Sequence, residues 1–125
     1  VVAQCPFVDL LNSMADPALP YTCSEYREWG DPLRPDEWRC LRSYSPYDTI
    51  RRQAYPHMLI TASLNDSQVP CWEPVKWAAR LRAANTASTQ ILLRVNLVSG
   101  HSGTSGRLRQ LRDTAFTTAF LLNLV

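Results

Sequence analysis

The 125-residue sequence has few glycines, no long hydrophobic run and little net charge. Its four glycines form no glycine-rich linker, and no internal repeat is visible, so the length fits one domain. The longest uncharged apolar stretch has about ten residues, whereas a membrane span needs roughly 20, so we expect no contact with a membrane. A net charge of +2 is too small to indicate a nucleic-acid-binding protein.

The four cysteines lack the spacing of a metal site or of a disulfide framework. Cys5, Cys23, Cys40 and Cys71 form no Cys-x-x-Cys pair and have no histidine close in sequence. We therefore expect four free thiols in a reducing compartment, a cytoplasmic location, and neither a bound metal nor a cofactor.

Charge is distributed unevenly along the chain. Residues 1–62 hold six basic and eight acidic residues, and residues 63–125 hold seven and three. Arg107, Arg109 and Arg112 cluster near the start of the last segment. They could form a basic surface for an anionic partner, or simply the solvated face of a helix.

Apolar patterning predicts an α/β fold. Residues 1–4, 58–62 and 91–96 are short apolar runs, typical of parallel strands that are covered on both faces. Residues 74–84 have helical periodicity, with Pro74 in the first turn, and we expect a last helix from a cap at Ser105 to about residue 122. The expected inner stripe of that helix consists of Leu108, Leu111, Ala115, Phe116, Ala119, Phe120 and Leu122.

The segment 16–56 differs from the rest of the chain. It is rich in proline and tyrosine, and only 24–29 and 36–43 resemble short helices. A long irregular excursion between two strands often builds a binding site.

Two residues with catalytic chemistry follow the predicted strands. Asp66 lies just after 58–62, and His101 lies just after 91–96. Ligands bind beyond the carboxyl ends of parallel strands, so an acid and a histidine are expected at one sheet edge, roughly 2.6–3.2 Å apart. Such a pair orients an imidazole as a general base. The alternative is an ordinary turn aspartate and a solvated histidine.

The chain contains no matching nucleophile. The elbow of a hydrolase reads Gly-x-Ser-x-Gly, and no such motif occurs. Ser102 and Ser105 lie between glycines but lack the spacing, and glycine-rich entry into the last helix explains both better.

Several separate motifs resemble the oligopeptidase B branch of the prolyl oligopeptidase family of serine peptidases, in register from residue 1 to about 122. These motifs are Pro6-Phe7-Val8-Asp9, Ser43-Tyr44-Ser45-Pro46-Tyr47-Asp48, Ala54-Tyr55-Pro56-His57, Leu64-Asn65-Asp66, Trp72-Glu73-Pro74-Val75-Lys76-Trp77 and Gly100-His101.

The resemblance implies an α/β-hydrolase catalytic domain covered by a β-propeller. Residues 1–125 would be the C-terminal portion of that domain, with an incomplete parallel sheet and helices on both faces. The serine elbow, the oxyanion-hole tyrosine and the propeller would then precede Val1, and the chain alone would be inactive. Asp66 would be the triad acid and His101 the triad base.

Substrate recognition is also implied by the resemblance. Glu25 matches a carboxylate that receives the arginine or lysine before the scissile bond, so short basic peptides are the expected substrates. Two positions depart from the family: Arg27 replaces a second acid that is common in bacterial members, and Gln68 replaces an arginine that holds the substrate backbone. Glu25 could instead only favour the positive end of a short helix.

Two rival functions remain open at this point. The chain could be a truncated, non-catalytic relative that acts as a binding or assembly module. A weaker alternative is an arginine-rich nucleic-acid binder, whose binding would weaken steeply with salt.

Overall fold

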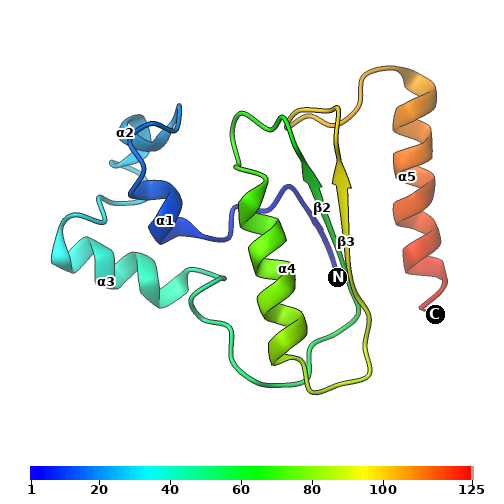
Figure 1. Cartoon of the computed structure of the whole chain (residues 1–125), viewed down its shortest axis with the longest axis horizontal. Coiled ribbons are helices and arrows are strands. Elements are labelled where there is room, and N and C mark those ends of the chain that lie inside the picture. Colours follow the sequence, from blue (N-terminus) through cyan, green and yellow to red (C-terminus); the bar gives the residue numbers. More distant parts are fainter. Residues whose placement is uncertain (125) are drawn as a thin grey trace.

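A three-stranded parallel sheet forms the centre of the computed structural model, which describes residues 1–124 (Figure 1). The strands are β1 (Val2–Gln4), β2 (Met58–Ser63) and β3 (Ile91–Asn96), in the order β1-β2-β3. Val2 pairs with Leu59, and Met58 pairs with Ile91. The three predicted strands are therefore confirmed, and β2 extends one residue beyond its predicted end.

Residues 1–124 contain five helices: α1 (Leu10–Met14), α2 (Thr22–Glu25), α3 (Pro35–Tyr44), α4 (Trp72–Ala84) and α5 (Arg107–Leu122). Of the two short helices expected at 24–29 and 36–43, the second is confirmed as α3, whereas α2 ends at Glu25 and residues 26–29 form a turn. No helix in residues 1–124 is long and apolar enough to span a bilayer.

Helix α4 covers one face of the sheet. Pro74 lies in its first turn, where a missing N–H disturbs no hydrogen bond. Ala78 and Leu81 are fully buried against Met58, Ile60 and Ile91. The predicted helix is thus confirmed, and this contact is the main hydrophobic core.

Helix α5 lies over the opposite face and packs far less tightly. The expected stripe is wrong as a description of burial: Leu108, Leu111 and Leu122 are 76%, 54% and 70% exposed, and of the stripe only Phe120 is buried. The helix also begins at Arg107 rather than at Ser105, after Gly106 in a left-handed conformation (φ 94°) and with no side-chain cap. Glycine adopts this conformation readily, so it replaces the predicted serine cap.

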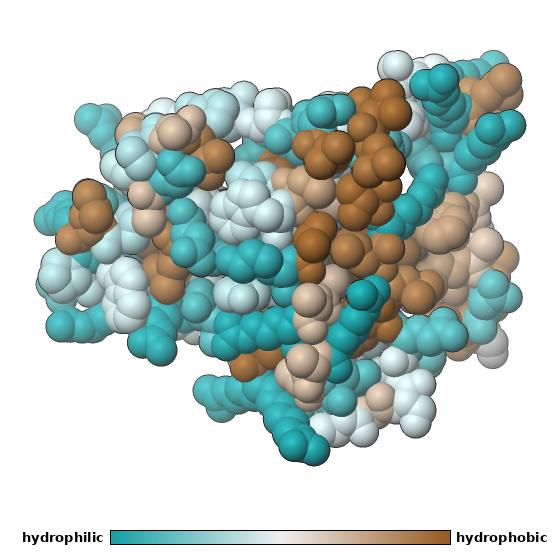
Figure 2. All heavy atoms as spheres, viewed as in Figure 1, coloured by the Kyte–Doolittle hydropathy of each residue, from teal (hydrophilic) through white to brown (hydrophobic). Residues whose placement is uncertain are grey.

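Hydrophobic surface remains open beside α5. Figure 2 shows apolar side chains gathered over the sheet between α4 and α5. Leu64, Leu97 and Val98, in the loops after β2 and β3, are each more than half exposed. Exposed apolar groups that lie this close together mark a surface that packs against something else.

Buried polar contacts join α1 to α4. The Glu73 carboxylate, fully buried, accepts hydrogen bonds of 2.8 Å from the amides of Val8 and Asp9 and a 2.5 Å bond from the Ser13 hydroxyl. Lys76 forms an ion pair of 2.6 Å with the buried Asp9 carboxylate. These contacts fix the position of α1 and of the neighbouring α2 relative to the sheet.

Candidate active site

The loops after β2 and β3 are joined to one another at the carboxyl edge of the sheet. The hydroxyls of Ser63 and Ser99 lie 3.0 Å apart and are buried, and the Asn65 side-chain amide donates to the Val98 carbonyl (3.2 Å). Gly100 packs so closely that a Cβ there would lie 3.3 Å from the Asn65 carbonyl oxygen. The two loops therefore hold their next residues, Asp66 and His101, at a fixed separation.

Asp66 is held from the α4 side. Its Oδ1 accepts hydrogen bonds of 2.9 Å from the backbone amides of both Gln68 and Val69, in the turn that leads toward α4. The side chain is only 2% exposed. A carboxylate bound by two amides in this way has one orientation, with its second oxygen directed outward.

His101 meets that second oxygen. Its Nδ1 lies 2.9 Å from Asp66 Oδ2 and 3.1 Å from Oδ1, within the distance expected from the sequence. Burial acts to raise the pKa of Asp66, but the bonds from Val69, Gln68 and His101 outweigh it and lower that pKa below its usual value. An ionised Asp66 accepts a hydrogen bond from Nδ1–H, which leaves Nε2 with a free lone pair.

A hollow of about 350 Å³ extends from His101 to α2 and contains Glu25. The Glu25 carboxylate accepts a 3.1 Å hydrogen bond from the indole of Trp29, four residues further along the chain, so a local side-chain contact orients it. Trp29 packs edge-on against Phe7, with ring centres 5.3 Å apart, and both line the hollow. The hollow therefore combines aromatic walls with an acidic end.

Glu28 lines the same hollow, and the sequence did not single it out. Arg27, which replaces a second acid of the family, is exposed and lines a different hollow beside Asp31 and Glu37. Glu28, also exposed, borders both hollows, whereas Arg27 borders only the one away from Glu25. Gln68, exposed, also borders the hollow.

Cys5 is the other neighbour of the Asp66–His101 pair that the sequence did not identify. It follows β1, and its thiol lies 3.9 Å from the His101 carbonyl oxygen. Burial raises the pKa of the Cys5 thiol, and the charge of Asp66 raises it further. Cys5 lies far from Asp66 and His101 in sequence, so no local motif could have revealed this contact.

A second hollow, of about 360 Å³, lies on the other side of His101, between the sheet and α5. Thr104 and Arg94 both bind Asp113 of α5, through a 2.6 Å hydrogen bond and an ion pair respectively. Ser102 borders this hollow. Within residues 1–124, the His101 ring nitrogens contact Asp66 and neither Ser102 nor Ser105, as expected for serines that belong to the entry into α5.

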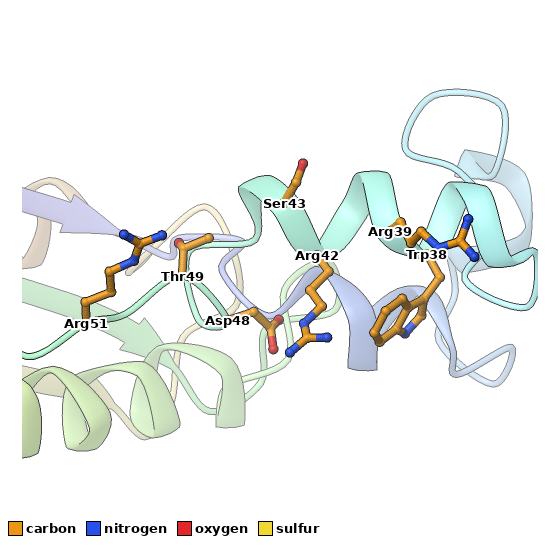
Figure 3. Close-up of a pocket in the computed structure, with 7 residues that line it drawn as sticks. All are labelled: Trp38, Arg39, Arg42, Ser43, Asp48, Thr49 and Arg51. Atoms are coloured by element: carbon orange, nitrogen blue, oxygen red, sulfur yellow. The ribbon is translucent and has the colours of Figure 1, made fainter.

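A further hollow on α3 is separate from these groups (Figure 3). It contains Arg39, Arg42 and Arg51, but neither Asp66 nor His101. Arg39 is paired with Asp36, and Arg42 stacks on the Trp38 ring at 5.1 Å. The chemistry expected from the sequence is therefore found at the sheet edge, not on this helix.

Known proteins resemble this chain in sequence and in fold. The sequence matches the prolyl oligopeptidase family over residues 1–125. The chain belongs to the prolyl oligopeptidase family. Its fold is that of the α/β-hydrolase domain: it matches the structure of oligopeptidase B from Leishmania major with a TM-score of 0.95 and 37% identity. Oligopeptidase B from Trypanosoma brucei, in a closed form with covalently bound antipain, matches with a TM-score of 0.94 and 44% identity.

Curated relatives extend the comparison. Protease 2 of Moraxella lacunata is 42% identical over 98% of this chain, and dipeptidyl aminopeptidase BI of Pseudoxanthomonas mexicana is 44% identical over 98%. The chain spans only 18% and 17% of these relatives, and 17% of each of the two oligopeptidase B chains. The likeness to oligopeptidase B predicted from the motifs is confirmed, and the chain is part of a peptidase family.

Proposed function

We propose that residues 1–125 form the C-terminal portion of the catalytic domain of a serine oligopeptidase, in which Asp66 and His101 are the acid and base of a Ser-Asp-His triad. The observation that carries this proposal is the 2.9 Å contact between His101 Nδ1 and the buried Asp66 carboxylate, at the mouth of an acidic hollow. The nucleophilic serine comes from a Gly-x-Ser-x-Gly elbow outside residues 1–125.

His101 carries out the proton transfers in this mechanism. Its Nε2 removes the proton of the attacking serine hydroxyl and later gives it to the leaving amine. Asp66 keeps Nδ1 protonated and stabilises the imidazolium that forms, because it stays ionised at neutral pH. The depressed pKa of Asp66 suits this role, since protonation of the acid would end the orientation of the imidazole.

The hollow between His101 and α2 would receive the basic side chain of a short peptide. A guanidinium forms two parallel hydrogen bonds with a carboxylate, and Glu25 is held ready for this by Trp29. Glu28 adds negative charge at the same hollow. The site therefore stays acidic although Arg27 replaces the second acid that is common in bacterial members of the family. Cleavage after Arg or Lys is the specificity that these side chains support.

The remaining partner is the rest of the catalytic domain with its propeller. In residues 1–124, β1 pairs only with β2, which leaves its other edge free for a further strand. The exposed apolar side chains of α5 offer a second contact surface. We propose that the chain is stable in this assembly and self-associates without it.

The complete gene product tests the proposal. It should hydrolyse an arginyl ester, lose activity with a serine-directed reagent, and lose nearly all activity as His101→Ala. The isolated 125-residue chain should be inactive. An inactive complete product that has no Gly-x-Ser-x-Gly elbow would instead support a non-catalytic binding module.

The position of the cleaved bond is a separate outcome. One relative is named a dipeptidyl aminopeptidase, so release of amino-terminal dipeptides is the second candidate activity. A blocked peptide with an internal arginine distinguishes the two: an oligopeptidase cleaves it, and an enzyme that requires a free amino terminus does not.

A further inference from the structure

Three side chains able to ligate a metal meet at the carboxyl edge of the sheet. The Cys5 thiol, a carboxylate oxygen of Asp66 and a ring nitrogen of His101 all lie within 4.8 Å of one another. Each residue follows a different strand, so the parallel sheet assembles the set from positions far apart in sequence. The cysteine spacing, which argued against zinc, could not detect a site of this kind.

We propose that Cys5, Asp66 and His101 form a binding site for Zn²⁺, and that its occupancy blocks the peptidase. Zinc binding needs only these three groups, whereas the inhibitory effect rests on the function proposed above. Zn²⁺ prefers thiolate, imidazole and carboxylate ligands in a tetrahedral arrangement. Three protein ligands leave a fourth position for water, and Mg²⁺ or Ca²⁺, which favour all-oxygen sites, should not compete.

The geometry needs only a small adjustment. Tetrahedral bonds of about 2.0–2.3 Å place neighbouring ligand atoms roughly 3.3–3.8 Å apart. All the separations here are at most 4.8 Å, so none has to close by more than about 1.5 Å. Asp66 Oδ2 and His101 Nδ1, now 2.9 Å apart and hydrogen-bonded, must separate by roughly 0.5 Å. The site is partly buried, which reduces competition from solvent.

Cys5 is held toward this pair by its backbone. Its φ of +42° is the only positive value for a non-glycine residue within residues 1–124. Its amide donates to the Thr61 carbonyl (2.9 Å), which anchors the residue to β2. A residue with a Cβ rarely adopts this conformation, so the thiol is directed by a constrained turn rather than by a mobile loop.

Zinc binding changes which groups of the site carry protons. The Cys5 thiol loses its proton to solvent as the metal–sulfur bond forms. His101 ligates through Nδ1, whose proton passes by way of solvent to Nε2, so the ring stays neutral. No oxidation or reduction occurs. The imidazole can then no longer remove the proton of a serine hydroxyl, and the Asp66 oxygen no longer orients it, so proton transfer stops.

Cobalt absorption tests the site without any activity assay. In the complete gene product, Co²⁺ should produce a near-ultraviolet thiolate-to-metal charge-transfer band that saturates at one equivalent and disappears when Zn²⁺ is added. Cys5→Ser, which is nearly isosteric, and Cys5→Val should both lack the band. The matched controls Cys23→Ser, at an exposed thiol, and Cys71→Ser, at a neighbouring half-buried thiol, should keep it.

Metal sensitivity of the peptidase gives the second readout. Loss of an outer hydrogen-bond partner already weakens metal sites about 10–100-fold, so Cys5→Ser should raise the half-inhibitory Zn²⁺ concentration at least tenfold, measured against its own metal-free rate. A band that survives in both Cys5 variants, or that vanishes in Cys71→Ser, overturns the assignment. A band that is present in the wild type and absent from both Cys5 variants, in a wild type that has no peptidase activity, would leave the metal site standing and refute the proposed function instead.

Discussion

The two faces of the sheet are built differently. On the α4 face, Ala78 and Leu81 are buried against the strands, and the turn before α4 holds Asp66 with two backbone amides. On the α5 face, the helix exposes most of its apolar side chains, and its polar link to the sheet runs through Asp113. The acid of the proposed triad thus belongs to the packed half, and His101 belongs to the loop that leads into the open half.

The two faces of the sheet therefore have different roles: the α4 face orients Asp66, and the α5 face offers a contact surface. A triad acid must not move, and its orientation comes from a core that residues 1–124 complete by themselves. The apolar side chains on the α5 face need a partner surface, which fits the proposed contact with the rest of the catalytic domain. His101 is positioned between the two halves by its bond to Asp66, so that bond should carry the largest functional effect.

Breaking the Asp66–His101 bond gives the first prediction. In the complete enzyme, Asp66→Asn should lower kcat/KM by about 10⁴-fold, because the amide favours the wrong tautomer of His101. Substrate hydrolysis at neutral pH measures the change, and an unaltered melting temperature would show that the fold is intact. A loss below about tenfold would remove Asp66 from the triad.

The unequal packing of the two faces gives the second prediction. In the isolated chain, diluted until it is monomeric, Leu81→Ala should lower the free energy of unfolding by about 2–5 kcal/mol, as large-to-small changes do in a closed core. Leu111→Ala, on the exposed side of α5, should change it by no more than about 0.5 kcal/mol. Urea unfolding of the two variants measures both values.

The same pair of variants sharpens the comparison in the complete enzyme. If the rest of the catalytic domain covers α5, Leu111→Ala should cost several times more there than in the isolated chain. Equal costs in the two settings would mean that Leu111 faces solvent in both.

The sequence predicted the strands and α4 well because their apolar patterns describe a core that the chain itself closes. The stripe on α5 was equally clear as a pattern, but periodicity shows which side chains are apolar and not what covers them. Gly106, in its left-handed conformation, takes the cap position expected for Ser105, and the helix has no side-chain cap.

The candidate site, like the fold, was predicted only in part from the sequence. Asp66 and His101 follow from one rule, that parallel strands bring their carboxyl ends to one edge. Cys5 and Glu28 were missed because their roles depend on tertiary placement: a strained turn after β1 and the direction of the turn after α2. Glu73 was visible only as part of a motif, and its buried contacts to the Val8 and Asp9 amides explain why those two motifs occur together.

The acidic hollow gives the third prediction. Glu25→Gln should lower kcat/KM for arginyl substrates at least tenfold, because a charge-assisted hydrogen bond contributes about 1.5–3 kcal/mol. The dependence of the rate on the His101 titration should stay unchanged. Asp36→Asn, at an exposed acid on α3, is the matched control and should have no effect.

Arg27→Glu should change the preference for Arg and Lys only slightly, since Arg27 lines another hollow. An intact arginyl turnover in Glu25→Gln would place recognition elsewhere.

The link between α5 and the sheet gives the fourth and smallest effect. The hydrogen bond from the Thr104 hydroxyl is the main cause that lowers the pKa of Asp113; burial opposes it, and Arg94 lowers the pKa further. A depressed carboxyl pKa means that this link stabilises the docked helix above the ordinary carboxyl pKa of about 4, and that the contribution is lost as the pH falls through the depressed value.

Thr104→Val keeps the shape and removes the hydroxyl, so the pKa of Asp113 should rise toward its usual value, as carboxyl NMR titration would measure. Amide exchange in α5 should become faster at mildly acidic pH, while exchange in α4 should not change, because α4 is held by buried apolar contacts that do not titrate. Equal acceleration in both helices would show that the two faces unfold as one unit and that the contrast between them is structural but not energetic.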